Sequence, residues 1–314
     1  MEPLFLRNKY IFGIILLLLL ASQLEAAFEG LYMGARPIGM GSAFVSVSDD
    51  SNAILWNPAG LSQLKKIEIV TLYSKLYWNI QDDNLNKNFA GFVLPFDKNI
   101  GTLGVGWANS SSSLYCENVF LFSFGRIIFE GFSFGFNAKA MLKTYAVNDY
   151  TLIDPVFVNG NLAFGISFDF GMLYKITRDL SIGITVDNIN RPDIHLQDTD
   201  KVCAVIKGGC SLSLGSLLFF KNILASAELD YYKNLSQDYK FIGGLESWFF
   251  DKTFAVRTGG GIGNNSFMEI DAGMSWIVFK TACLLQIDYA FRYSLNGSME
   301  GTIGSHFIST TVKF

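Results

Sequence analysis

Apolar and polar residues alternate along most of this chain with the period of two that is typical of β-strands. Near the end of the chain, Ile287, Tyr289 and Phe291 fall on one face of a predicted strand, whereas Asp288 and Arg292 fall on the other. One face therefore suits lipid and the other suits water, as in the wall of a membrane-spanning barrel.

Fourteen such stretches are predicted, which is an even number. They are residues 66–77, 87–95, 100–109, 116–127, 131–145, 160–175, 179–189, 201–214, 221–232, 239–249, 253–260, 266–277, 281–293 and 304–314. The links between them alternate in length, as in barrels with short periplasmic turns and long outer loops. Long links cover 146–160, 189–200 and 294–303, and tight ones cover 97–99, 177–179 and 251–252. We expect an all-β fold, a 14-stranded antiparallel transmembrane β-barrel spanning residues 66–314.

A secreted β-sandwich would also alternate, so the start of the chain bears on the choice. Residues 1–26 are predicted to be a signal peptide, because Arg7 and Lys9 precede an apolar run over 11–21 and Ala26 follows at the expected cleavage site. That run is shorter than the roughly 20 apolar residues of a spanning helix. No cysteine lies near the cleavage site, which argues against a lipid anchor.

The end of the chain gives a second indication of an outer-membrane barrel. Phe314 closes the last predicted strand, with Val312, Thr310 and Ile308 at every second position before it. Such an aromatic end resembles the signal by which the barrel-assembly machinery recognises its substrates. We therefore expect that machinery as a partner.

Composition agrees with this interpretation. Half of the residues are hydrophobic, and the chain contains 29 Phe, 13 Tyr and 30 Gly, which suit lipid-facing walls and close packing. A net charge of −4 argues against nucleic acid as a partner, because phosphates require basic surfaces. We expect localisation in the outer membrane of a Gram-negative-type bacterium, with its lipid as a partner.

Catalytic, metal and cofactor sites are not predicted. His195 lies in a predicted outer loop and His306 on the outward face of the last strand, neither with a hydroxyl and carboxylate at a spacing that suggests a triad. Cys203 and Cys210 are placed on one predicted strand, too far apart to pair, and Cys116 and Cys283 lie on distant strands. No close-spaced His or Cys cluster suggests a metal site.

Residues 27–65, between the signal peptide and the first strand, break the alternation. Asp49 or Asp50 is expected to cap a short helix through about Trp56, and Asn57 with Pro58 offers a second helix start. Glycines in this segment allow close approach of backbone or positive φ. We expect a compact hatch inside the lumen, with these residues singled out: Gly34, Gly39, Gly41, Asp49, Asp50, Asn57, Pro58 and Gly60.

Two motifs in this segment, GARPIGMGSAF and DDSNAILWNPAGL, resemble the start of the PorV/PorQ-like proteins of the FadL-type outer-membrane superfamily. The resemblance implies fourteen strands, an N-terminal hatch and a non-enzymatic role. FadL-type members pass hydrophobic molecules such as fatty acids or hydrocarbons sideways through a kinked wall strand. PorV-type members serve a secretion machine and hold exported proteins at the surface. The preferred function is therefore transport or binding of hydrophobic small molecules, and the alternative is a secretion-associated scaffold that contacts a secreted protein.

Three glycines in the third predicted strand, Gly101, Gly104 and Gly106, bear on the choice between these functions. Glycine weakens a strand and permits a bulge, so that a lateral gap in the wall could form there. The alternative is that these glycines only relieve crowding against the hatch.

Charges of both signs are predicted to face the lumen. They are Lys139, Lys143, Lys207, Arg257 and Arg292 on the basic side, with Asp169, Glu228, Asp230, Glu246, Glu269, Asp271 and Asp288 on the acidic side. Because an unpaired charge away from bulk water is costly, we expect pairs across a narrow lumen. The alternative is the polar lining of an open pore.

Overall fold

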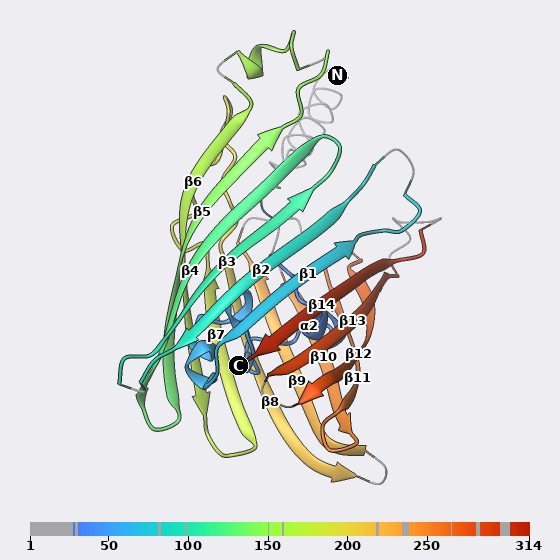
Figure 1. Cartoon of the computed structure of the whole chain (residues 1–314). Coiled ribbons are helices and arrows are strands. Elements are labelled where there is room, and N and C mark those ends of the chain that lie inside the picture. Colours follow the sequence, from blue (N-terminus) through green and yellow to red (C-terminus); the bar gives the residue numbers. More distant parts are fainter. Residues whose placement is uncertain are drawn as a thin grey trace, which may run out of the picture.

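The chain forms a closed barrel of fourteen antiparallel strands in which β1 pairs with β14 (Figure 1). This is a computed structural model that describes residues 28, 31–80, 83–97, 99–149, 151–158, 160–217, 220–233, 239–264, 266–280, 283–295 and 302–314. The strands are β1 Glu68–Lys75, β2 Asn86–Pro95, β3 Thr102–Ser111, β4 Tyr115–Phe129, β5 Phe132–Tyr145, β6 Leu162–Lys175, β7 Leu180–Asp187, β8 Val205–Leu217, β9 Phe220–Tyr232, β10 Tyr239–Phe249, β11 Phe254–Gly263, β12 Met268–Lys280, β13 Leu284–Ser294 and β14 Ser305–Lys313. The predicted fold class is confirmed.

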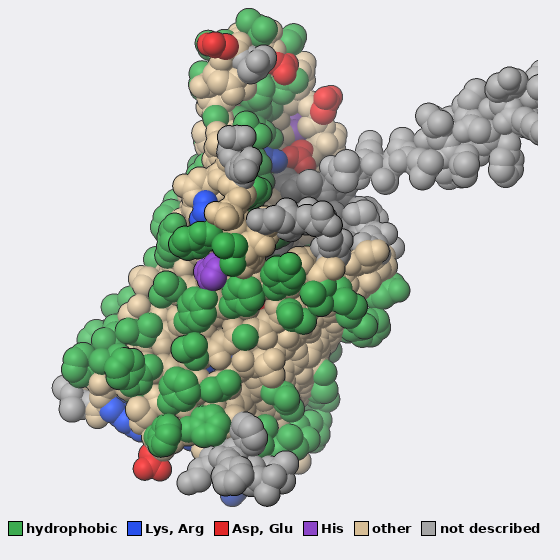
Figure 2. All heavy atoms as spheres, turned by 90° about the vertical axis from the view of Figure 1, so that its right-hand side faces the viewer, with side chains coloured by type: hydrophobic (Ala, Val, Ile, Leu, Met, Phe, Trp, Pro, Cys, Tyr) green, Lys and Arg blue, Asp and Glu red, His purple; other side chains and the backbone are tan. Residues whose placement is uncertain are grey.

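The alternation of the sequence becomes two faces of the wall. In β6, Phe164, Ile166 and Phe168 are 54%, 51% and 43% exposed, whereas the intervening Ser167 and Asp169 are buried. Figure 2 shows hydrophobic side chains spread over the outer wall, with many of the charged side chains near its two ends. The polar face therefore lines the interior, as the period of two predicts.

The links form two different rims (Figure 1). One rim carries tight turns, such as that between β4 and β5, where Gly131 takes a φ of 78°. The other carries the long links, including that between β5 and β6, which contains the short 3-10 helix η2 Pro155–Phe157. In outer-membrane barrels the tight turns face the periplasm, so we refer to a periplasmic rim and an outer rim.

The largest difference from the predicted strand bounds lies at the start of β8, predicted at residue 201 and observed at Val205. Cys203 precedes this strand and is buried, whereas Cys210 lies within it and is exposed. The placement of both cysteines on one strand was therefore wrong. All four cysteines are free.

Residues 31–64, which we call the luminal segment, lie inside the barrel (Figure 1). They contain α2 Ala35–Gly39, α3 Ala53–Trp56 and the 3-10 helix η1 Pro58–Gln63. Among the residues described, no helix has the length and hydropathy needed to cross a membrane. The predicted signal peptide, residues 1–26, lies outside the described residues.

Candidate functional site

An apolar core joins the luminal segment to the wall. Trp56 is 1% exposed, its indole nitrogen donates to the Met33 carbonyl at 2.8 Å, and its ring packs edge-on against Phe44. Val70 and Phe89, on the inward faces of β1 and β2, belong to the same buried cluster. The interior of the barrel is therefore packed like the core of a soluble domain at this level.

Wall glycines allow the backbone of the luminal segment to approach the strands closely. A Cβ atom on Gly135 of β5 would lie 2.3 Å from the Ala59 nitrogen, and one on Gly244 of β10 would lie 2.2 Å from the Met40 carbonyl oxygen. Four further wall glycines make comparable contacts with the segment: Gly125, Gly171, Gly183 and Gly259. These six glycines, which we call the glycine belt, belong to β4, β5, β6, β7, β10 and β11. The contacts therefore extend around much of the barrel.

The glycines predicted within the hatch are also in close contact. Gly34 and Gly41 have φ of 101° and 66°, a region that other residues rarely adopt. A Cβ atom on Gly60 would lie 2.2 Å from the Ser48 carbonyl oxygen, and one on Gly39 would lie 3.0 Å from the Cα of Gly273 in β12. These positions therefore have little room for a larger residue.

Asn57 holds the turn between α3 and η1. Its side-chain oxygen accepts a hydrogen bond from Ala59 at 3.0 Å, with Pro58 at the first helical position, as the Asn-Pro pair predicts. Its amide nitrogen donates to the carbonyls of Val45 at 2.8 Å and of Met172 in β6 at 3.0 Å. One buried side chain thus ties two parts of the luminal segment to the wall.

The predicted aspartate cap of the preceding helix is wrong in detail. Helix α3 begins at Ala53, with Asn52 at the cap position and no side-chain capping bond. Asp50 instead accepts hydrogen bonds from the backbone and side chain of Asn52 at 2.9 and 2.8 Å. Asp49 pairs with Arg36 at 2.6 Å. Asp50 thus makes a local hydrogen bond ahead of the helix and also pairs with Arg36.

Arg36, which sequence reasoning did not single out, is the centre of the main charge cluster. It is 7% exposed and pairs with Glu246 of β10 at 2.8 Å and with Asp50 at 2.8 Å. Glu246 also pairs with Arg257 of β11 at 2.6 Å. The cluster therefore connects the luminal segment to two wall strands by charge-assisted hydrogen bonds.

Electrostatics favour the charged state of Asp50 within this cluster. Burial by itself raises the pKa of the Asp50 carboxyl, but the positive charges of Arg36 and Lys313 outweigh burial. The pKa of Asp50 consequently lies below its usual value. At neutral pH the carboxylate and the guanidinium are both ionised.

Except for Glu228 and Asp230, the predicted lumen charges form ion pairs with one another or with neighbouring groups. Those pairs are Lys139 with Asp169 (2.6 Å), Lys143 with Asp200 (3.2 Å), Lys207 with Asp187 (2.9 Å), Arg257 with Asp288 (3.4 Å), and Arg292 with Asp271 (2.7 Å) and Glu269 (3.1 Å). Glu228 accepts from the backbone nitrogen of Val45 at 2.8 Å, and Asp230 accepts from the Tyr32 hydroxyl at 2.7 Å. The described interior is thus cross-linked.

The glycines of the proposed wall kink do not open the barrel at β3. Gly101 precedes this strand, and β3 pairs with β2 and β4 from Thr102 to Ser111 without a shift of register. Cβ atoms on Gly104 and Gly106 would each lie 3.0 Å from Ile54. The structure therefore favours relief of crowding over a kink at this strand.

The outer mouth of the lumen is covered by the link between β7 and β8. This link was expected to be a polar outer loop, but Ile194 and Val202 within it are fully buried. Gly165 of β6 makes room for Ile194, since a Cβ atom there would lie 2.7 Å from the isoleucine side chain. A void of only about 20 Å³ adjoins this link at Asn188. It is lined by apolar residues such as Phe28, and by Lys139 and Lys207, each of which pairs with an aspartate.

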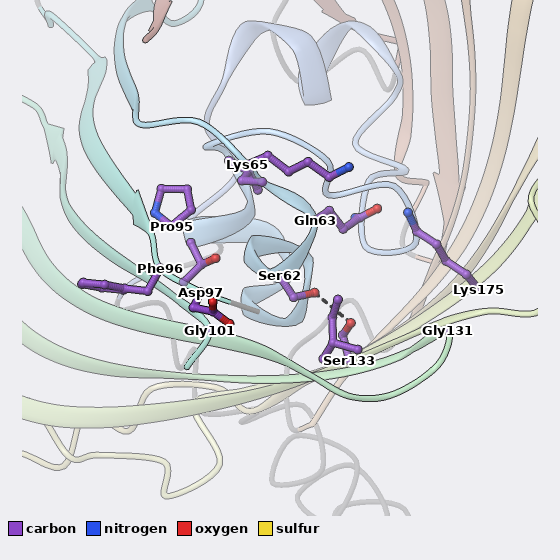
Figure 3. A pocket seen from close by; sticks show the side chains of 13 residues that line it. Ser62, Gln63, Lys65, Pro95, Phe96, Asp97, Gly101, Gly131, Ser133 and Lys175 are labelled. Carbon is purple, nitrogen blue, oxygen red and sulfur yellow. Dashed lines mark hydrogen bonds between the residues drawn. The ribbon is translucent and has the colours of Figure 1, made fainter. Parts of the chain in front are cut away.

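The periplasmic mouth holds a larger pocket of about 400 Å³ (Figure 3). Gln63 and Leu64 at the end of the luminal segment, with the adjoining Lys65, form one side. The turn between β2 and β3, together with β4, β5 and β6, forms the other, with Ile127 and Lys175 among its residues. We call this hollow the periplasmic pocket, and no pattern in the sequence predicted it.

Neither histidine belongs to a catalytic arrangement of described side chains. His195 pairs with Asp193 at 3.0 Å on the surface, and His306 contacts the Tyr289 hydroxyl at 2.7 Å. Across the part of the chain that the structure describes, no group of three His, Cys, Asp or Glu side chains is arranged to hold a metal ion.

Several solved structures share this fold. The CymD monoaromatic hydrocarbon channel is 13% identical with a TM-score of 0.64, and covers 91% of this chain and 98% of its own. The Ralstonia pickettii toluene transporter TbuX is 11% identical with a TM-score of 0.62, over 91% and 98% of the two chains. A Pseudomonas aeruginosa FadL homologue is 9% identical with a TM-score of 0.61, over 90% and 98%. At these identities the likeness shows the fold alone, and it confirms the FadL-type architecture.

A search among curated proteins gave no match. The profile of a family described as "Type IX secretion system membrane protein PorP/SprF" matches residues 50–312. The resemblance to PorV/PorQ is not confirmed by name, since the family that matches is PorP/SprF. Neither this family nor the similar structures are described as enzymes. The protein is an outer-membrane β-barrel of a Gram-negative-type bacterium, and the chain belongs to the PorP/SprF family of type IX secretion system membrane proteins.

Proposed function

We propose that this barrel serves type IX secretion as a closed outer-membrane scaffold and not as a pore. The observation that carries the proposal is the luminal segment, which contacts glycines on six wall strands and fills the barrel at that level. The family description supports the secretion context. On this proposal residues 1–26 are removed on export, residues 27–65 act as a fixed hatch and residues 66–314 form the barrel.

The contacts of the hatch argue for a permanent plug. Moving it would separate Arg36 from Glu246 of β10, and would expose Trp56 from an apolar core. Breaking a buried ion pair by removing one partner costs about 3–5 kcal/mol, and apolar exposure adds to that cost. A scaffold that binds proteins at its surfaces needs no such movement.

A deletion strain tests this function. We expect loss of the barrel to reduce the amount of type IX cargo at the cell surface and in the medium, and the wild-type gene to restore it. The same strain should take up labelled oleate and toluene at the wild-type rate. Normal export of every cargo protein in the deletion strain would contradict the proposal.

Passage of hydrophobic small molecules is the second candidate. It is favoured by the apolar side of the void at the outer mouth, where Phe28, Leu31 and Met141 contribute, in a barrel with the fold of hydrocarbon channels. The void of about 20 Å³ is far below the roughly 300–1,000 Å³ of ligand pockets, so this function requires the covering link to move. Reduced uptake of oleate or toluene in the deletion strain, restored by the gene, would favour this candidate.

Three partners follow from the proposal. The outward face of the strands suits the lipid of the outer membrane. At the surface of the barrel, the expected partner is a secreted protein. The last strand, β14, leads to Phe314, which is 55% exposed, and we propose this end as the contact with the barrel-assembly machinery. Removal of Phe314 should lower the fraction of assembled barrel on heat-modifiability gels.

A further inference from the structure

The periplasmic pocket combines an apolar surface with positive charge. Leu64 is buried in its wall, whereas Ile127 remains 40% exposed although it faces inward, opposite the buried Ser133 in the ladder of β4 and β5. The inward-facing Val119 and Leu121 of the same strand are 1% and 4% exposed, so the exposure of Ile127 sets it apart. Exposed apolar surface rimmed by polar groups often marks a binding site.

Two lysines stand at this pocket without a carboxylate partner. Lys65 and Lys175 both line it and are exposed, and within the described part of the chain no ion pair joins either lysine to an acidic group. The pocket's own carboxylate, Asp97, accepts from the Asn99 backbone at 3.0 Å and so stabilises its own turn. The described lining therefore carries a net positive charge.

Gln63 adds a free hydrogen-bond acceptor between these charges. Its amide nitrogen donates to the carbonyls of Val47 and Ser48 at 2.9 and 3.1 Å, which fixes the side chain. Its amide oxygen has no partner among the described residues, and Figure 3 shows it directed to the same side as the amine of Lys175. An oriented acceptor suits a backbone N–H group.

We infer that the periplasmic pocket binds a short segment of a periplasmic protein that carries acidic and large apolar side chains. Carboxylates would meet Lys65 and Lys175, an apolar side chain would contact Ile127, and a backbone N–H would donate to Gln63. The volume of about 400 Å³ falls within the roughly 300–1,000 Å³ of binding pockets.

A lipid is a poorer occupant for this pocket. Its lining includes Ser133 and Thr102, which are buried on the inward face of the wall, so the pocket belongs to the mouth of the lumen and not to the lipid-facing surface. A fatty acid offers no hydrogen-bond donor to Gln63 once its carboxyl is ionised. The inference rests on the proposed function, because a secretion scaffold is expected to contact periplasmic proteins.

Fluorescence polarisation with the full-length barrel in nanodiscs tests the inference. The probe is a short fluorescein-labelled peptide in which Asp and Glu alternate with Leu and Phe. Two comparison peptides carry Lys in place of the acids, or Ser in place of Leu and Phe. We expect saturable binding of the first peptide alone, weakened at least about tenfold by Lys65→Glu with Lys175→Glu. The matched control Lys252→Glu reverses an exposed charge on the same rim outside the pocket, and should leave binding unchanged.

The outcomes are distinguishable. Absence of saturable binding, or equal binding to all variants and to empty nanodiscs, would overturn the inference, as would binding of palmitate without binding of the peptide. Heat-modifiable gel mobility identifies any variant that fails to fold. If the peptide binds while the deletion strain still exports all cargo, the pocket stands and the secretion function fails. If the peptide does not bind and export is lost, the secretion function stands and the pocket inference fails.

Discussion

At the scale of single residues, the glycine belt determines how closely the luminal segment can approach the wall. Gly135→Ala would place a methyl group in overlap with the Ala59 nitrogen, because the ideal Cβ is only 2.3 Å from that atom. We expect a loss of about 1–3 kcal/mol in the free energy of unfolding, the usual cost of overpacking. Urea unfolding in phospholipid vesicles, followed by tryptophan fluorescence, measures it.

Gly208→Ala is the matched control for this substitution. Gly208 lies in β8, where an added Cβ would meet nothing within 4 Å. The free energy of unfolding of the Gly208→Ala variant should stay within about 0.5 kcal/mol of the wild type or rise slightly, because alanine restricts the unfolded chain. Equal destabilisation at the two positions would show that close approach to the luminal segment is not the cause.

Arg36 offers a second test at this scale. Arg36→Met retains much of the apolar stem but leaves Glu246 and Asp50 with one cation fewer in a buried cluster. We expect a loss of about 3–5 kcal/mol in the free energy of unfolding. Arg178→Met, at an exposed position on a tight turn, should change stability by less than about 0.5 kcal/mol.

The stability contributed by the pairing of Asp50 with Arg36 has a defined pH dependence. Because the folded-state pKa of Asp50 is lowered, its contribution to stability is fully present above the unfolded pKa of about 3.9 and is lost as the pH falls through the lower folded value. The stability difference between wild type and Asp50→Asn should therefore be constant from neutral pH to about pH 5 and shrink below about pH 4. A difference that grows on acidification would contradict this assignment.

At the scale of the elements, the link between β7 and β8 acts as a cover. Ile194→Ala should create a cavity against Gly165, lower stability by about 2–4 kcal/mol and expose the link to protease added outside intact cells. Ile189→Ala, in the same link at a position that is 50% exposed, should have little effect on either measurement. Unchanged protease resistance with Ile194→Ala would mean that this side chain does not hold the cover.

The elements also separate what the sequence can predict from what it cannot. Strands such as β6 follow from local alternation, so their bounds and faces were predicted, and Asn57 with Pro58 marked a helix start for the same local reason. Ile194 was missed because one apolar residue in a polar link has no period. Arg36 was missed because its partner Glu246 is 210 positions away, and only the closed barrel brings the two together.

At the scale of the whole molecule, the barrel resembles transporters in fold while its interior is filled. The periplasmic pocket illustrates the limit of sequence reasoning at this scale, since its lining comes from the end of the luminal segment, from two turns and from five strands. The glycine belt likewise forms only when the strands close into a barrel. We therefore regard the filling of the lumen as the property that separates a scaffold from a channel.

Single-channel recording in planar bilayers tests this central property most directly. The purified wild-type protein, with a porin in the same bilayer system as positive control, should show no steady open-channel conductance. The luminal segment fills the barrel at the glycine belt, and the described interior charges are largely paired. A large, steady conductance from the wild-type barrel would contradict the filled lumen and the scaffold function that rests on it.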